Sequence, residues 1–213
     1  QPEEEMGLPF VHGVSVTATN QTDAVVVAAA GAGGGKAGVA GSAGVIVMNE
    51  TTRAVVGSGA TLNALDNGAA GQGINVFADS NSTLFALGAG VAGGGKVGLG
   101  AGVGVVVLDK LTEASLGGTA FAQGNVRVQA LSDERAIIIG AAAGGGGAAG
   151  IAGGAAVNVF TLTTRAQIGA GASIDADGSV VVAADDQTQL DVVGGSISGA
   201  GGLLHIEKCL ITG

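Results

Sequence analysis

Three side chains near the end of the sequence, His205, Glu207 and Cys209, are of the types that form metal sites and cysteine nucleophiles. Imidazole nitrogen and thiolate sulfur bind zinc, and a neighbouring histidine can activate a cysteine thiolate. A structural zinc site needs four ligands, a nucleophile needs an oriented base, and the only other histidine is His12. We therefore expect these side chains to pack in a terminal cap, and we predict no catalytic residue and no metal ligand.

A second set of candidate ligands is acidic. Residues 175–178 read Asp-Ala-Asp-Gly, which resembles the opening of a calcium loop, and Asp185 and Asp186 follow. The glutamate that completes such a loop is absent, and so is the Gly-Gly-x-Gly-x-Asp repeat of calcium-binding β-rolls. We expect a turn, and calcium binding by Asp175 and Asp177 is left to experiment.

A third candidate is a phosphate-binding loop, because residues 90–96 read Gly-Val-Ala-Gly-Gly-Gly-Lys. The hydroxyl residue that should follow the lysine to hold magnesium is Val97. Residues 30–37 hold the same place earlier in the chain, and Ala148 replaces the lysine later in it. The glycines therefore belong to a repeat, and we predict no nucleotide and no other cofactor.

That repeat organises the whole chain. Similar strand-like segments begin at Val14, Ile74, Val126 and Val180, which are 60, 52 and 54 residues apart, and each is followed by further apolar runs at matching offsets. Self-similarity at such a period indicates a stacked or radial array of one supersecondary unit. The predicted units are 14–73, 74–125, 126–179 and an incomplete 180–203.

Both ends depart from the repeat. We expect residues 1–13 to be an N-terminal cap or a non-repeat segment, with Met6 to His12 covering the first unit. Residues 204–213 are either a cap or the start of another region. The acidic opening does not resemble a signal peptide, and we interpret the chain as a fragment or a processed product.

Glycine alternates with apolar residues within the units, at every step from Val97 to Val105. A period of two is that of a strand, and a strand with one bare face lets a second sheet approach closely. A membrane helix is the alternative for residues 24–48, which are apolar apart from Lys36 and Ser42. Consecutive glycines and valine-rich flanks favour the strand.

Composition limits both fold and partners. The chain has 213 residues, 43 glycines and five phenylalanines, without tryptophan or tyrosine, so small aliphatic side chains must form its core. This composition predicts a thin, elongated molecule. A net charge of −9 argues against nucleic acid and against an anionic membrane surface. The single cysteine excludes an internal disulfide.

These observations predict an all-β protein, a right-handed parallel β-solenoid (β-helix) built from about four 52–60-residue repeats. Equivalent segments would stack in ladders. A unit of this length is too long for one rung of ordinary strands, so we expect it to span two or more rungs. A β-propeller is the alternative, but its Trp-Asp and Gly-His dipeptides are missing.

Carbohydrate-active enzymes also use β-solenoids, with clustered charged residues on one face and aromatic side chains that stack on sugars. Arg53, Glu113 and Arg165 share one repeat position and could line up along a rod, although we expect each to lie in a polar turn. Because tryptophan and tyrosine are absent, a carbohydrate cleft is not expected.

Residues 14–202 resemble the glycine- and alanine-rich repeats of large bacterial filamentous adhesins, including leukotoxin-like and filamentous haemagglutinin-like surface proteins. The segments that carry this resemblance are residues 126–130, 140–147, 157–169 and 177–183. The resemblance implies a non-catalytic structural or adhesive segment, secreted or displayed on the surface of a Gram-negative bacterium.

On this resemblance, the expected partner is a receptor or glycan on a host or neighbouring cell, bound through a longer parent protein. The expected form is a monomeric rod whose ends can associate, and contact with a membrane is left open. The alternative functions are a membrane-active toxin segment with inserting glycine-rich strands and a carbohydrate-active β-helix enzyme.

Overall fold

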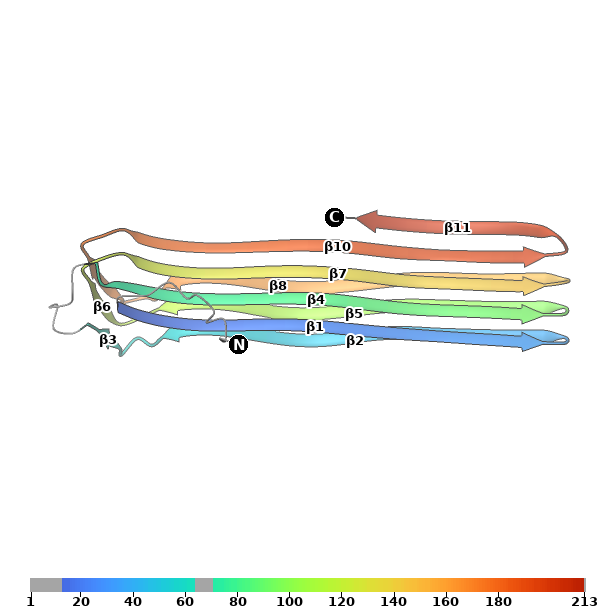
Figure 1. The fold of residues 1–213 in the computed structure, drawn as a ribbon, viewed down its shortest axis with the longest axis horizontal. Coiled ribbons are helices and arrows are strands. Elements are labelled where there is room, and N and C mark those ends of the chain that lie inside the picture. The colour runs from blue at the N-terminus through green and yellow to red at the C-terminus, as the bar shows by residue number, and fades with distance from the viewer. Residues whose placement is uncertain (1–12, 64–70, 213) are drawn as a thin grey trace, which may run out of the picture.

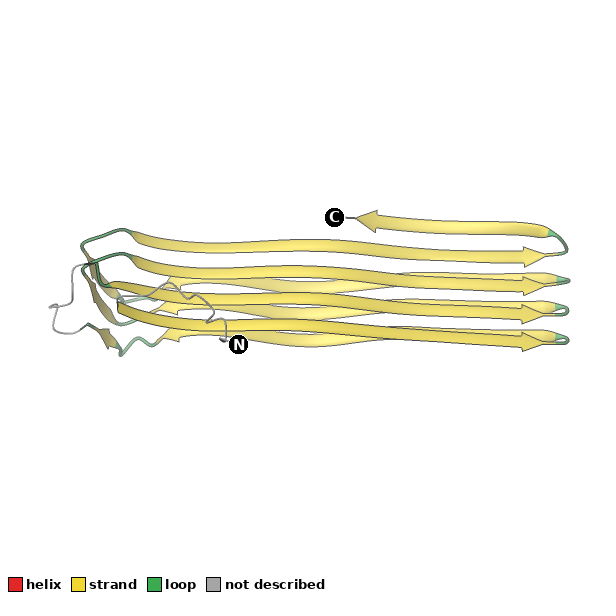
Figure 2. Cartoon of the chain, in the orientation of Figure 1, coloured by secondary structure: helices red, strands yellow, loops and turns green. Residues whose placement is uncertain are grey.

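The computed structural model describes residues 13–63 and 71–212, and within these residues every regular element is a strand (Figure 2). Two long strands form most of each repeat, and a third, short strand completes three of them. The long strands are β1 (Gly13–Gly34), β2 (Ala37–Val56), β4 (Gly73–Gly94), β5 (Val97–Leu116), β7 (Val126–Gly146), β8 (Ala149–Ile168), β10 (Val180–Ala200) and β11 (Leu203–Thr212). The short strands are β3 (Thr61–Leu62), β6 (Thr119–Ala122) and β9 (Ser173–Ala176).

These strands form an elongated slab of two facing sheets, closed at one end by a small third sheet (Figure 1). The order is β1-β4-β7-β10-β11 in sheet A, β2-β5-β8 in sheet B and β3-β6-β9 in sheet C. Apart from β11, all neighbouring strands run parallel. The chain is therefore a parallel β-solenoid, as the repeat predicts.

The register of sheet A matches the repeat, because Val14 pairs with Ile74, Ile74 with Val126 and Val126 with Val180. Each repeat is thus one rung, and our expectation of two or more rungs per repeat is wrong. The reason is strand length. Strands of 20 to 22 residues take up a repeat that ordinary strands of about five residues would fill several times over.

Inward-facing side chains divide the interior into zones along the strands. An apolar cluster beside sheet C contains Val76, Leu116 and Val128, and a second apolar cluster contains Leu84, Val106 and Ile138. Polar residues lie between the two clusters, in the middle of the long strands. Beyond the second cluster the inward positions are mostly glycine and alanine.

The glycine end brings the two backbones into contact. A Cβ atom added to Gly88 of β4 would overlap the carbonyl oxygen of Val103 in β5, and one on Gly140 of β7 would overlap that of Ala155 in β8. Only glycine, or alanine where the sheets part slightly, fits such positions. The close approach expected from the alternating glycines is therefore present.

The last strand departs from this scheme. The first three long strands of sheet A each cross to sheet B through a short turn, whereas β10 turns back within sheet A to form a hairpin with β11. Gly201 (φ 55°) and Gly202 (φ 88°) make this tight turn, which requires left-handed backbone at both positions.

Side-chain size explains why β11 stays in sheet A. By repeat position, Leu204 and Lys208 correspond to Gly150 and Gly154 of β8. A Cβ atom on either glycine would already overlap a backbone oxygen of β10, so the larger side chains cannot enter the space between the sheets. Instead, β11 pairs antiparallel with Asp191–Ala200 and covers that part of the β10 edge. The predicted cap at Met6 to His12 lies outside the described residues.

Candidate functional site

The strongest concentration of polar side chains lies inside the slab, where sheets A and B face each other at mid-strand. We call this set the polar band. On sheet A it comprises Asn20, Thr22, Ser80, Ser82, Ser132, Glu134, Asp186 and Thr188, and on sheet B it comprises Glu50, Thr52, Lys110, Thr112 and Thr164. Asp186 and Thr188 continue the row onto β10, where both are exposed. The parallel register stacks these residues rung above rung.

A buried ion pair is at the centre of the polar band. Lys110 Nζ lies 2.7 Å from Glu134 Oε1, and each side chain is only 1% exposed. The same ammonium donates to the backbone carbonyl oxygens of Ser80 at 2.9 Å and Asp133 at 3.4 Å. All three N–H donors of Lys110 are therefore used, which offsets part of the large cost of removing the charge from water.

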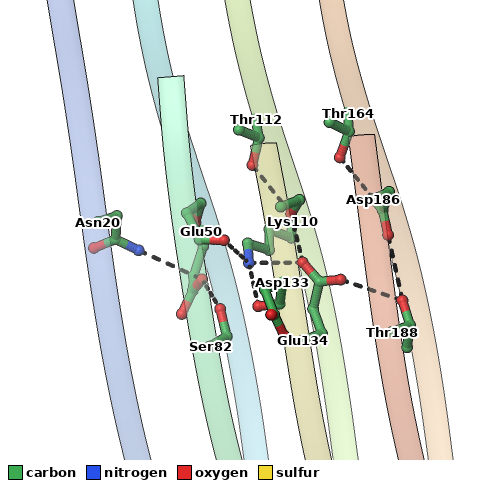
Figure 3. A network of polar contacts seen from close by, with 12 residues as sticks. Asn20, Glu50, Ser82, Lys110, Thr112, Asp133, Glu134, Thr164, Asp186 and Thr188 are labelled. Carbon is green, nitrogen blue, oxygen red and sulfur yellow. Dashed lines mark hydrogen bonds and ion pairs between the residues drawn. The ribbon is translucent and has the colours of Figure 1, made fainter. Parts of the chain in front are cut away.

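Glu134 extends the contacts along the stack (Figure 3). Its Oε1 accepts a hydrogen bond from Ser132, and its Oε2 accepts one from Thr188 Oγ1 at 3.2 Å. Asp186 then accepts hydrogen bonds from Thr188 at 3.3 Å and from Thr164 at 2.6 Å. This half of the band therefore connects β7, β8 and β10 through side chains.

Glu50 of β2 has, in the first rung, the position that Lys110 has in β5. Its carboxylate is buried, and Oε2 accepts hydrogen bonds from Ser82 Oγ at 2.7 Å and Asn20 Nδ2 at 3.5 Å. Glu50 and Lys110 are paired in the β2–β5 ladder, so an acid of the first rung lies beside a base of the second, and the third rung has Leu162 at this position. The polar band thus joins the rungs by side-chain contacts in addition to the backbone ladders.

A second ionic group lies on the outer face of sheet B. Arg53 Nη2 and Arg165 Nη2 each lie 2.7 Å from a carboxylate oxygen of Glu113, and Gln167 Nε2 donates to the same carboxylate at 3.1 Å. The alignment of these residues along the rod is as anticipated. Their expected location in turns is wrong, because all three charged residues lie within long strands that are longer than we assumed.

The phosphate-loop sequence does not form an anion cradle. The amide of Gly95 donates to Gly34 O, and the amides of Lys96 and Val97 both donate to Lys36 O. These are the amides that would have to face a phosphate. They are instead bonded to the turn of the preceding rung, so the motif serves to stack the turns.

The remaining candidate residues lie on the surface. His205 and Glu207 are in contact at 3.2 Å, are each 71% exposed and lie with exposed Cys209 on one face of β11, so they do not pack in a cap as we expected. Asp175 is an exposed residue of β9, and Asp177 follows in an exposed bend. Across residues 13–63 and 71–212, no group of three or more His, Cys, Asp or Glu side chains could hold a metal ion.

Sequence reasoning missed the polar band. Lys110 and Glu134 were hidden because each lies in a polar stretch that resembles a turn between two apolar runs. One signal was available. In a strand of period two, Leu108, Lys110 and Thr112 share a face with buried Val106 and Ala114.

Comparisons with known proteins were made with the whole chain, and no family model, curated protein or solved structure matches it. Among the residues that the structure describes, no helix is long and apolar enough to cross a membrane.

Proposed function

We propose that the chain is a structural and adhesive β-solenoid segment of a large secreted bacterial surface protein, without a catalytic role. The observation that carries this proposal is that the charged side chains of the interior bond to one another and to neighbouring rungs. Lys110 and Glu134 are buried and bonded to each other, to backbone and to neighbouring rungs, so their chemistry goes into holding the stack together. Such an interior stiffens a stalk and leaves the outer faces and loops to bind partners.

The outer faces are the surfaces available for adhesion. A display role at the surface of a Gram-negative bacterium, with a receptor or glycan on another cell as partner, accords with a repetitive scaffold whose turns tolerate changes in length. Fluorescently labelled chain is expected to bind target cells or a glycan array saturably. The control is the same chain unfolded by heat, which should not bind. Equal binding by the unfolded chain would contradict adhesion through the solenoid.

The structural part of the proposal has its own test. Small-angle scattering should give the profile of an extended, rod-like monomer in solution. A compact sphere of the same mass would contradict a stalk.

A membrane-active segment is the second candidate, and one observation favours it. The outward positions over the glycine end are apolar on both sheets, including the exposed side chains of Val39, Val91 and Ile151. Release of dye from liposomes would support this candidate. The unpaired backbone along the described edges of β1 and β8 counts against it, because such edges are not tolerated in hydrocarbon.

A further inference from the structure

Each strand of sheet B lies between two successive strands of sheet A. A Cβ atom on Gly98 of β5 would lie 2.9 Å from Ala92 O of β4 and would overlap Gly145 O of β7. One on Gly150 of β8 would lie 2.5 Å from Gly144 O of β7 and would overlap Gly199 O of β10. By this rule a further strand of sheet B belongs between β10 and β11, and none of the described residues fills that place.

A hollow of about 550 Å³ occupies this vacant place. Gly154 of β8 forms one wall, Gly194 and Ser196 of β10 form the roof, and Glu207 and Cys209 of β11 continue it. The hollow therefore continues both the sheet B ladder and the glycine contact between the sheets.

Gly194 of β10 keeps the glycine that contacts a sheet B strand in the preceding rungs, although no described sheet B strand follows β10. The equivalent positions in the two preceding rungs are Gly88 and Gly140, whose added Cβ atoms would overlap the sheet B strand of their own rung. A Cβ atom on Gly194 would come no closer than 3.4 Å to Gly154 O, an ordinary contact. Nothing in the described structure presses against Gly194 from the side of the hollow.

Two further surfaces around the hollow lack partners. β8 is the edge strand of sheet B, so along its 20 residues one side of the backbone forms no ladder with any described strand. The inward face of β11 is also uncovered, with Leu203 81% and Ile211 58% exposed. A strand seated in the hollow would pair with the first surface and cover part of the second.

We propose that the hollow is a strand-binding site, which takes an extended polypeptide segment with glycine or alanine at every second residue. The bound segment pairs in parallel with β8, as β8 pairs with β5, and its small residues lie against Gly194 and Ser196. Main-chain hydrogen bonds supply the affinity, and the narrow gap between the sheets supplies the selection for small side chains.

A second folded copy of the chain does not fit this site. Its exposed sheet B strands, β2 and β8, each carry sheet A strands of their own on both sides, as the glycine contacts of β8 illustrate. Placing either strand in the hollow would put its accompanying sheet A strand on β10. The occupant is therefore a single extended strand.

The test uses a synthetic peptide with the sequence of residues 149–162, extended by lysines for solubility, and the full chain as receptor. Cys209 is the only cysteine and lines the hollow, so its alkylation by iodoacetamide reports occupancy. Saturating peptide is expected to slow alkylation at least about tenfold, because the bound strand covers that face of β11.

Two matched controls make the result specific. A peptide with valine in place of both Gly150 and Gly154 is expected to give no protection, because its inward side chains exceed the gap. The Gly194→Val chain should fold but lose protection, whereas Gly93→Val, on the open outer face of β4 and away from the hollow, should behave as the unaltered chain. Protection by the valine peptide, protection of Gly194→Val, or no protection of the unaltered chain would each overturn the proposal.

Discussion

Lys110 of β5 and Glu134 of β7 form an ion pair of 2.7 Å in the interior of the solenoid, where each side chain is 1% exposed. Replacement of Lys110 by methionine leaves the carboxylate of Glu134 buried without its cation. Breaking a buried pair in this way typically lowers the free energy of unfolding by about 3–5 kcal/mol. Urea denaturation of the variant should show a loss of this size.

The matched control for this substitution is Lys96→Met, at an exposed turn, which should change stability little. The double variant Lys110→Met/Glu134→Leu should recover most of the loss, because a well-packed apolar pair of similar volume can replace a buried ion pair. If Lys110→Met alone is as stable as the unaltered chain, the pair does not support the stack.

Gly88 and Gly93 lie on opposite faces of β4 and should respond in opposite ways to valine. A Cβ atom on Gly88 would overlap Val103 O, whereas one on Gly93 meets nothing within 4 Å. Gly88→Val should lower the free energy of unfolding by at least about 1–3 kcal/mol, the usual cost of overpacking. Gly93→Val should be neutral or slightly stabilising, because valine favours strands. Thermal melts of the two variants compare them directly, and equal melting temperatures would contradict the close sheet contact.

The outer ionic group should matter much less than the inner pair. Arg53 is 51% exposed, and its removal leaves the buried carboxylate of Glu113, 2% exposed, in contact with Arg165 and Gln167. We expect Arg53→Ala to cost less than about 1 kcal/mol, because Glu113 keeps these partners and the guanidinium that is lost was half exposed. The difference from the unaltered chain should shrink further at high salt, because screening weakens exposed pairs. A loss as large as that of Lys110→Met would show that this group is a main support of the stack.

Much of the fold follows from the sequence, and the exceptions have physical causes. Matching offsets between Val14, Ile74 and Val126 predict the ladders, and alternating glycine predicts the close sheets. The number of rungs was misjudged because average strand length was assumed, although nothing in the 22 residues of β4 breaks a strand. Polar residues such as Ser80 and Ser82 resembled a turn, but they face polar residues of sheet B: Ser82 donates to Glu50, and the backbone carbonyl of Ser80 accepts from Lys110.

The terminal hairpin could be predicted in part from the sequence. Two positions that hold glycine in β8 are Leu204 and Lys208 in the last segment. These large side chains indicate that the chain leaves the two-sheet pattern. The direction of the departure depends on the left-handed turn at Gly201 and Gly202, which a pair of glycines permits but does not require.

Removal of the hairpin should expose an edge. Deletion of residues 203–213 would leave Asp191–Ala200 of β10 without its antiparallel partner. Unpaired, apolar edges promote association through strand pairing. Light scattering of the shortened chain should show concentration-dependent assembly that the full chain lacks. If both chains scatter alike, β11 does not protect that edge.

The central claim, that one repeat forms one rung, can be measured directly as a distance between spin labels. Thr19 pairs with Asp79, Asp79 with Leu131 and Leu131 with Asp185, so Thr19 and Asp185 lie three strand spacings apart in sheet A. Cysteines at these two positions, in a Cys209→Ser background, would carry the labels.

At about 4.8 Å per parallel neighbour, one rung per repeat predicts a backbone separation of roughly 14 Å between these positions. Strong dipolar coupling at this short distance is the expected electron paramagnetic resonance result. A separation of roughly 29 Å, which two rungs per repeat would give at the same spacing, would contradict the structure.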